Sequence, residues 1–524
     1  MKDPYLLHQL LTGSVREPGL SAVHFGDRLA TYGEIQKTVE RYASMLRGLG
    51  LARGERVAVL LPRGVEECCA MFAPSRAEGV LVPINSGLRP TQIRHILTDS
   101  GASILLTDRG HLERMAEAMQ GLETLRRVLS IDGVPERTHA GIRIDSLVDL
   151  EPLSSCAPSR SIGEDLAAIL YTSGSTGLPK GVMLSHRNLL AGTRIVRTYL
   201  GISRADRILS ILPFSFDYGL NQWLTAVEQG ACLVPFTFKF GDQIVSALRD
   251  YEITGLAGVP TIWAILTRAA PSLGRTALPH LRYITNSGGA VPSDSVRKLR
   301  GLLPDTRIYL MYGLTEAFRS SFLPPDEVDE RPTSIGKAIP ECELFVVDEN
   351  GREAPRGEPG ILVHRGPTVS LGYWKRPADT ARVIRQNPLR PAQEGGDLVC
   401  FSGDRVIQDE DGYFYFVGRE DAMIKCSGFR ISPTEVEEVL AGTGMFGHVA
   451  VIGLPDPVLG QRVHAVAVPT SDGVDTRVAL VACAQALAVH MIPSAIELVD
   501  SLPTSPNGKV DYKALIRERI ANAQ

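Results

Sequence analysis

One run of small hydroxylic residues and glycines, residues 171–182 (YTSGSTGLPKGV), is the stretch best suited to chemistry. Glycines let the backbone approach a ligand closely, and convergent backbone N–H groups of such loops bind phosphate. The spacing is not that of the P-loop, G-x-x-x-x-G-K-[ST]. We therefore expect a polyphosphate site of another kind, the alternative being an ordinary Ser/Gly surface loop. Its candidate residues are Thr172, Ser173, Gly174, Ser175, Thr176, Gly177 and Lys180.

The same run closely resembles the phosphate-binding loop of the adenylate-forming superfamily, which includes acyl-CoA synthetases, peptide-synthetase adenylation domains and firefly luciferase. Four further stretches resemble motifs of that superfamily, in its order along the chain: residues 312–316 (YGLTE), 402–404 (SGD), 418–431 (GREDAMIKCSGFRI) and 506–509 (PNGK). Ser402 stands where the superfamily has threonine and retains the hydroxyl group. Within the superfamily the chain is most similar to stand-alone AMP-ligases, such as exosortase-associated acyl-CoA ligases and β-amino-acid-activating ligases.

The resemblance implies ATP and Mg²⁺ as cofactors. Lys509 would bridge the acyl carboxylate and the α-phosphate, two anions that need a cation between them. Thr315 would donate to the α-phosphate. Glu316 would bind Mg²⁺, which needs few carboxylates beside phosphate oxygens and water. Without the resemblance, Lys509 would be read as a solvated lysine and Glu316 as a carboxylate at a helix N-terminus. The ribose and adenine would contact Tyr312, Ser287, Gly288, Gly289, Ala290, Asp404 and Arg419.

The resemblance also points to residues 214–218 (FSFDY) as part of the acid-binding pocket. Phe216 and Asp217 resemble the Phe-Asp pair of amino-acid-activating domains, whose Asp pairs with the substrate ammonium. A buried charge among aromatic side chains needs a partner. Asp217 could instead cap a helix beginning at Tyr218, or pair with Arg319, which could itself bind a second carboxylate. The predicted substrate-binding residues are Phe216, Asp217, Tyr218, Asn221, Ser287, Gly313, Arg319 and Ser320.

Two half-reactions are implied by the resemblance. ATP and a carboxylic acid give acyl-AMP and pyrophosphate, and a phosphopantetheine thiol of a carrier protein or CoA then displaces AMP. Between them the C-terminal domain would rotate at Asp421, and Lys425 and Gly428 would border the thiol tunnel. Asp217 favours an amino or β-amino acid as substrate, and a fatty or aryl acyl-CoA synthetase is the alternative. A luciferase-type oxygenase and a non-catalytic adenylate-binding protein are weaker alternatives.

Short apolar runs alternate with helical patterns along much of the chain. Residues 55–61, 80–84 and 103–107 are expected strands, and residues 65–78 and 90–98 are the expected helices between them. Such alternation predicts parallel sheets with crossover helices. The pattern resumes with expected strands at residues 166–171, 207–212, 231–236, 255–259, 281–285 and 307–309, and with a helix starting near His186 directly after the phosphate loop.

The pattern changes after about Pro332, where short strands and Asn-Gly and Asp-Gly turns predict a β-rich subdomain at about residues 333–418. A last strand–helix–strand unit follows a polar stretch that contains Asp421. We therefore predict an N-terminal adenylation domain, residues 1–419, and a C-terminal domain, residues 420–524, with a hinge near residue 421. The fold class is α/β: a large domain of layered, parallel-rich sheets and a small mobile α+β domain.

The composition is that of an ordinary globular chain of 524 residues. Its net charge of −4 provides no basic field for nucleic acid or anionic lipid. No apolar run reaches the ~20 residues of a membrane span, and the N-terminus lacks the features of a signal peptide. The eight cysteines form no C-x-x-C pair, which disfavours structural zinc and fits a reducing compartment. We expect a cytoplasmic protein with no membrane span and no nucleic-acid partner.

Overall fold

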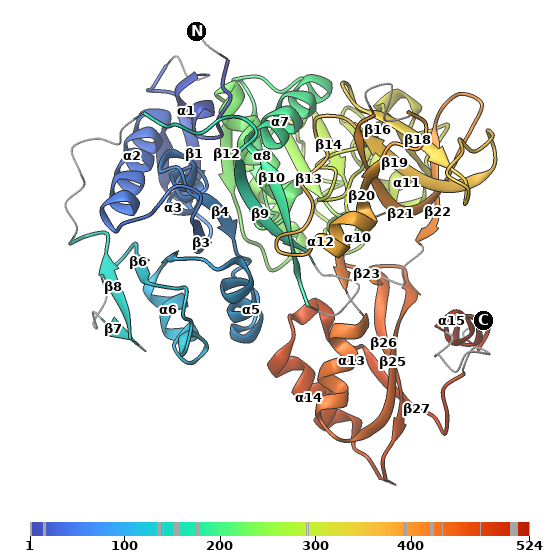
Figure 1. The fold of residues 1–524 in the computed structure, drawn as a ribbon. Helices are drawn as coiled ribbons and strands as arrows, with labels where there is room; N and C mark the ends of the chain where they lie inside the picture. Colours follow the sequence, from blue (N-terminus) through green and yellow to red (C-terminus); the bar gives the residue numbers. More distant parts are fainter. Residues whose placement is uncertain are drawn as a thin grey trace.

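The computed structural model describes residues 3–13, 17–133, 138–139, 141–149, 158–172, 178–289, 291, 293–390, 396–419, 424–431, 433–471, 473–503 and 512–522. Within these ranges the chain forms a large N-terminal domain of sheets and helices and a small C-terminal domain (Figure 1). The expected α/β fold class is confirmed. No helix in the described part of the chain combines the length and apolarity that a membrane crossing requires.

An eight-stranded sheet, counted over the described residues, carries the phosphate hairpin at one edge. Its central strands pair in parallel, as the apolar runs predicted. The strands in spatial order are β10 (Lys180–Ser185), β9 (Leu166–Thr172), β4 (Val80–Pro83), β3 (Arg56–Leu60), β5 (Ile104–Thr107), β6 (Arg127–Ser130), β8 (Ile142–Ser146) and β7 (Thr138–His139). The hairpin β9–β10 is antiparallel, so Thr172 and Lys180 face each other at the end where the glycine-rich run connects the two strands.

The second large sheet joins parallel and antiparallel parts. Pairing is parallel from β1 through β12, β11, β13 and β14 to β15, and antiparallel from β15 onward. The β-rich segment expected after Pro332 is therefore hydrogen-bonded to the parallel part through β16 and β17. The strands in order are β18 (Glu343–Val347), β19 (Pro359–Arg365), β21 (Leu398–Gln408), β22 (Phe414–Arg419), β17 (Ser334–Ala338), β16 (Ser321–Leu323), β15 (Arg307–Tyr312), β14 (Tyr283–Asn286), β13 (Gly255–Gly258), β11 (Arg207–Ser210), β12 (Cys232–Pro235), β1 (Ser21–Phe25) and β2 (Arg28–Thr31), with β20 (Ile384–Gln386) on β21.

The helices of the large domain pack on these sheets around a continuous apolar core. The helix expected at residues 65–78 is two short helices, because a new helix begins with Pro74 in its first turn, where a missing N–H costs nothing. The helix expected near His186 begins there, capped by Ser185 and Asn188. The helices are α1 (Gln9–Gly13), α2 (Tyr32–Gly48), α3 (Val65–Ala70), α4 (Ala73–Arg76), α5 (Pro90–Ser100), α6 (Arg109–Met115), α7 (His186–Leu200), α8 (Asp217–Gln229), α9 (Gly241–Asp250), α10 (Pro260–Arg268), α11 (Ser293–Leu302) and α12 (Pro377–Val383), with 3₁₀ turns η1 (Glu117–Met119) and η2 (Pro325–Glu327).

The small domain is a separate sheet with helices on both faces. Along β25, Val451 packs in the cluster of α13 and α14, whereas Ala450 and Ile452 pack in the cluster of α15, as strand alternation requires. The predicted boundary and the hinge Asp421 lie outside the described residues. The elements are β23 (Ile424–Cys426), β24 (Phe429–Ile431), α13 (Pro433–Gly442), β25 (Phe446–Asp456), β26 (Gly460–Pro469), α14 (Thr476–Ala486), η4 (Val489–Met491), β27 (Ala495–Leu498) and α15 (Tyr512–Asn522).

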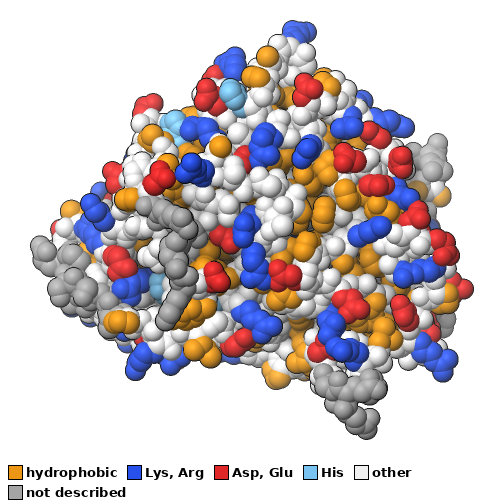
Figure 2. Space-filling view, turned by 90° about the horizontal axis from the view of Figure 1, so that it is seen from above, with side chains coloured by type: hydrophobic (Ala, Val, Ile, Leu, Met, Phe, Trp, Pro, Cys, Tyr) orange, Lys and Arg blue, Asp and Glu red, His pale blue; other side chains and the backbone are white. Residues whose placement is uncertain are grey.

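The surface carries interspersed charges on the face drawn in Figure 2, where Lys and Arg alternate with Asp and Glu. This mixture agrees with the small net charge of −4. The view offers no extended region of one sign that would attract a polyanion.

Candidate active site

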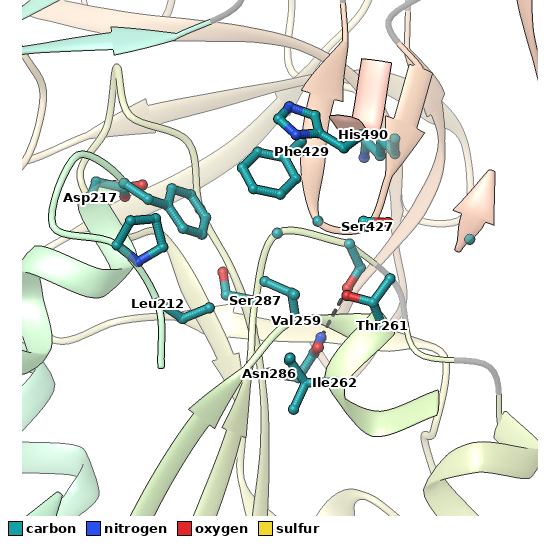
Figure 3. Close-up of a pocket in the computed structure, with 18 of the residues that line it drawn as sticks. Leu212, Asp217, Val259, Thr261, Ile262, Asn286, Ser287, Ser427, Phe429 and His490 are labelled. Atoms are coloured by element: carbon teal, nitrogen blue, oxygen red, sulfur yellow. Dashed lines mark hydrogen bonds between the residues drawn. The ribbon is translucent and has the colours of Figure 1, made fainter. Parts of the chain in front are cut away.

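A cavity of about 970 Å³ lies where the large domain meets the small one. Its wall in the large domain is formed by residues that follow β13, β14 and β15 and by the start of α8. Its other wall includes the β23–β24 turn and η4 of the small domain (Figure 3). Ligands of α/β sheets bind at the carboxyl ends of parallel strands, which is the position of this cavity.

The turn after β14 presents backbone to the cavity. Ser287, Gly288 and Gly289 line it, and Gly288 has a φ of +82°. Asn286, which Figure 3 labels, holds the turn: its Nδ2 donates to the carbonyl of Gly289 over 2.9 Å, and its Oδ1 accepts from Trp263 Nε1 over 2.9 Å. Asn286 is not among the residues predicted from the sequence, although its position directly after an expected strand is a usable signal. Ala290 lies outside the described residues.

The phosphate hairpin brings Thr172 to the cavity wall. Lys180 is buried; its Nζ lies 3.1 Å from a carboxylate oxygen of Asp379 in α12 and 5.5 Å from the ring centroid of Tyr373. Both partners come from segments far along the sequence, and the sequence analysis identified neither. The predicted phosphate residues Ser173, Gly174, Ser175, Thr176 and Gly177 lie outside the described residues.

Residues 369–374 join the phosphate hairpin to the YGLTE loop, and we name this segment the strap. On one side Met183 N donates to Gly372 O over 2.8 Å and Trp374 N donates to Gly181 O over 2.8 Å. On the other side Ser370 N donates to Glu316 O over 2.8 Å. The strap therefore fixes the distance between the hairpin and the loop.

Glu316 is buried, and its Oε1 accepts a hydrogen bond from Tyr373 Oη over 2.6 Å. Thr315, its neighbour, lines the cavity, whereas Glu316 itself lies behind the wall. One tyrosine thus contacts the predicted metal ligand through its hydroxyl and the predicted phosphate ligand Lys180 through its ring face. No spacing rule marks Tyr373, because 57 residues separate it from Glu316.

Residues predicted to bind the ribose and the adenine lie next to one another. Tyr312 lines the cavity, and its Oη donates to the fully buried Asp404, which does not itself reach the cavity wall. Ser402 Oγ accepts from Asp404 N over 3.0 Å and donates to Leu362 O over 2.7 Å, so this hydroxyl orients the strand. Arg419 pairs with Asp404 across β21 and β22 through the backbone.

The predicted acid pocket contains a buried ion pair. Arg319 Nη1 lies 3.5 Å from Asp217 Oδ2, and the side chains are only 3% and 5% exposed. Both residues line the cavity with Phe216, Ser287 and Gly313. The expectation that Asp217 caps a helix from Tyr218 is wrong, because α8 begins at Asp217 itself and Phe216 occupies the cap position.

Three other predicted substrate residues are buried but do not line the cavity. Tyr218 Oη donates to Thr285 O over 2.8 Å. Ser320 Oγ donates to Ala317 O over 3.3 Å. Asn221 follows Asp217 by one helical turn of α8. These side chains support the pocket from behind.

The small domain closes the cavity with the turn around Gly428. Gly428 has a φ of +80°, and a Cβ added there would lie 2.6 Å from Val259 Cβ. Phe429 stacks on His490 with ring centroids 3.8 Å apart (Figure 3), and burial lowers the pKa of His490 to about 4. Lys425 lines the cavity beside Phe416, whose ring centroid is 4.1 Å from its Nζ.

Hydrogen bonds from α5 and from the residue before it hold the small domain in this position. Gln92 Nε2 donates to Glu435 Oε1 over 3.1 Å, and Arg89 Nε donates to Leu487 O over 3.1 Å. The predicted catalytic Lys509 lies outside the described residues.

Comparisons with known proteins cover nearly the whole chain. The family model described as AMP-binding enzyme matches residues 13–374, and that of the AMP-binding enzyme C-terminal domain matches residues 435–509. A feruloyl-CoA synthase of an Amycolatopsis species is 34% identical over 96% of each chain. An L-proline–[L-prolyl-carrier protein] ligase of Pseudomonas fluorescens is 30% identical over 98% of this chain and 99% of its own.

Solved structures share the fold. An amide bond synthetase, McbA from Marinactinospora thermotolerans, matches with a TM-score of 0.87 and 24% identity, covering 98% of this chain and 99% of its own. ATP-bound MatB from Rhodopseudomonas palustris matches with a TM-score of 0.68 and 26% identity, covering 98% of each chain.

Proposed function

The chain belongs to the AMP-binding enzyme family, and on that premise we propose that its cavity carries out two half-reactions. In the first, a carboxylate oxygen attacks the α-phosphorus of ATP, and the bond to the pyrophosphate oxygen breaks. In the second, a phosphopantetheine thiol of CoA or a carrier protein attacks the acyl carbon, AMP leaves, and the thiol proton is released. The chain is accordingly an AMP-forming ligase.

One observation carries this proposal: a single cavity joins the strand-end residues suited to a nucleotide with a turn of the small domain suited to a thiol. Ser287, Gly288 and Thr315 line one wall, and Gly428 lines the other. Because both groups face one space, an acyl-adenylate held on the first could react with a thiol that enters past the second.

The residues around the hairpin fit ATP with Mg²⁺. Thr172 and Lys180 stand at the two ends of the glycine-rich run and would hold phosphate oxygens. Glu316, a buried carboxylate next to Thr315, would supply the protein ligand to the metal. Lys509 would neutralise the carboxylate and the α-phosphate as they meet. Bound Mg²⁺ would supply charge neutralisation for the phosphates.

The domain arrangement suits the second half-reaction. The Gly428 turn lies against Val259 and Gly288 at the cavity, which is where a thiol tunnel bordered by Lys425 and Gly428 would end. We propose that the small domain rotates about Asp421 to bring Lys509 into the same cavity for the first half-reaction. This rotation would break the bonds that Arg89 and Gln92 make to the small domain.

Two classes of acid remain candidates, an amino or β-amino acid and a plain aryl or fatty acid. Asp217 favours the first class, as an acidic residue in an aromatic pocket. The contact between Arg319 and Asp217 favours the second, because a substrate ammonium would have to compete with a guanidinium already 3.5 Å away. Relatives are named for both, a feruloyl-CoA synthase and a prolyl-carrier ligase.

The test is pyrophosphate release from ATP with a panel of aryl, fatty, amino and β-amino acids, with CoA omitted. We expect release with at least one class, and its loss when a chelator removes Mg²⁺. Addition of CoA or of a phosphopantetheinylated carrier protein should then give the thioester. Absence of pyrophosphate release with every class, from protein that still binds ATP, would refute the proposed activity.

A further inference from the structure

The backbone of Arg319 adopts a conformation that favours glycine, with a φ of +102°. Two contacts hold it there: Thr368 Oγ1 donates to the carbonyl of Arg319 over 3.3 Å, and Gly313 packs so closely that a Cβ on it would lie 3.2 Å from Arg319 Cα. Strain of this kind persists only where the surroundings over-determine it, and such places cluster at ligand sites. The strained backbone therefore indicates that the position of the Arg319 side chain has a function.

The guanidinium of Arg319 has more donors than acceptors around it. Nη1 reaches Asp217 Oδ2 at 3.5 Å, the outer limit of a hydrogen bond. Nε and Nη2 are buried and have no acceptor among the residues that the structure describes. These two nitrogens form one edge of the guanidinium, which presents two parallel N–H groups. Buried donors are almost always paired in folded proteins, so this edge calls for an acceptor.

The guanidinium lies over two aromatic rings. Arg319 Cζ lies 4.7 Å from the ring centroid of Tyr218 and 5.7 Å from that of Phe318. Ring faces stabilise a cation but supply no lone pair in the plane of the N–H groups. Because Arg319 lines the cavity, the missing acceptor can come from a molecule that enters it.

The charge balance selects the kind of acceptor. Asp217 already neutralises Arg319, so a second carboxylate would leave a net negative charge in a buried site, and an ammonium would leave a net positive charge. Either excess charge is strongly disfavoured in such surroundings. An uncharged oxygen, by contrast, accepts from the free edge and leaves the pair neutral.

We propose that Arg319 selects acids whose distal end carries an uncharged oxygen acceptor, such as a hydroxyl group, and that Asp217 sets the balance of charge. This inference rests on the proposed ligase function and names its substrate class. Arg319 is then a specificity-determining residue, and Asp217 acts on the substrate through the charge of Arg319.

The experiment measures kcat/KM for pyrophosphate release in two matched acid series. One is octanoic acid with ω-hydrogen, ω-hydroxyl, ω-amino or ω-carboxyl; the other is cinnamic acid with para-hydrogen, para-hydroxyl, para-aminomethyl or para-carboxyl. In the series that fits the cavity we expect the hydroxyl acid to exceed the other three by about tenfold. Equal kcat/KM for the hydrogen and hydroxyl acids in both series would overturn the inference.

Two variants then test the charge balance in opposite directions. Arg319→Gln leaves Asp217 unbalanced, so preference should move toward the amino-terminated acid. Asp217→Asn leaves Arg319 unbalanced, so preference should move toward the diacid. The control is Arg197→Gln, which removes a partly buried arginine that is paired to a carboxylate, Glu228 at 3.1 Å, and does not line the cavity. The acid preference of this variant should equal that of the wild type.

The outcomes separate cleanly. Reciprocal shifts support the inference, because damaged folding would lower kcat/KM for every acid without reversing the preference. A parallel loss for all acids in both variants would overturn it. If either variant fails to fold, the wild-type series still decides. If no acid of these two series releases pyrophosphate but an amino or β-amino acid does, the inference is overturned and the ligase function stands. Failure of the amino and β-amino acids as well would instead refute the ligase function on which the inference rests.

Discussion

Alanine in place of Gly428 should impair one half-reaction and spare the other. Gly428 has a φ of +80°, and a Cβ added there would lie 2.6 Å from Val259 Cβ and 2.7 and 2.9 Å from its two methyl carbons. Gly288 also lies close to this turn, since a Cβ added to Gly288 would lie 3.3 Å from Gly428 O. The turn of the small domain therefore fits against the large domain only without a side chain.

The magnitude follows from these contacts. Overpacking of this kind costs about 1–3 kcal/mol, which lowers the population of the present domain arrangement about 5- to 150-fold. The positive φ adds a cost of about 1–2 kcal/mol for alanine. That second cost is paid in every domain arrangement, so it lowers the stability of the small domain and leaves the balance between arrangements unchanged.

The assay follows the half-reactions separately. Pyrophosphate release should stay close to that of the wild type, and thioester formation from supplied acyl-AMP and thiol should fall by the factor above. The matched control is Gly444→Ala in the same domain, where φ is +70° and nothing lies within 4 Å of the added Cβ. If Gly444→Ala slowed thioester formation as much, or if Gly428→Ala slowed both half-reactions equally, the contact with Val259 would not be the cause.

Three further predictions concern the large domain. Tyr373→Phe removes only the hydroxyl that donates to Glu316 over 2.6 Å. Because a hydrogen bond to a charged group is worth about 1.5–3 kcal/mol, the rate of pyrophosphate release should fall by up to about 10- to 150-fold, and the reaction should need a higher Mg²⁺ concentration. Asp379→Asn removes the ion pair between Asp379 and Lys180, so the melting temperature should fall. KM for ATP should also fall, about fivefold, because an ion pair worth about 1 kcal/mol no longer competes with the phosphates for Lys180. Burial lowers the pKa of His186 from 6.5 to about 4, so the unfolded chain takes up the proton first and stability is lost as pH falls below 6.5. His186→Asn should flatten that decline, measured as the urea midpoint at neutral and mildly acidic pH.

Each of these predictions can fail in a recognisable way. An unchanged Mg²⁺ requirement in Tyr373→Phe would mean that the hydroxyl does not orient Glu316 toward the metal. A higher KM for ATP in Asp379→Asn would mean that Asp379 holds Lys180 in its binding position. If stability falls as steeply with pH in His186→Asn as in the wild type, the loss of stability comes from other buried groups. One such group is His8, whose pKa burial lowers to about 3.

Much of the fold could be predicted from local patterns. Buried parallel strands such as β3, β4 and β5 are short continuous apolar runs, and the turns between them are marked by glycine and proline. Pro74 indicated the break between α3 and α4, but the apolar periodicity continues across it and predicted a single helix. The pairing of the β-rich segment with the parallel sheet could not be predicted, because it joins strands that are distant along the chain.

The candidate site, like the fold, has a part that local sequence patterns predict and a part that they do not. Motif residues such as Tyr312, Thr315 and Gly428 could be predicted to share a site because each motif is contiguous, and all three line the cavity. The pairing of Asp217 with Arg319 stayed open, since it depends on the backbone angle at Arg319 and on a contact across 102 residues. Tyr373 and Asp379 were missed for the same reason: a side chain that reaches the site from a remote segment leaves no local signature.

The strap has a consequence for how the protein is made. The hairpin β9–β10 is synthesised well before the strap, residues 369–374, which bonds to the hairpin and to Glu316. The 189 residues between the end of β10 at Ser185 and Trp374 (374 − 185) take about 9–38 s to synthesise at roughly 5–20 residues per second. Throughout that time the nascent chain has the edge strand β10 without the strap residues that later bond to its Gly181 and Met183. An unpaired edge is a site of misassociation, so this interval is when the growing chain most needs a chaperone.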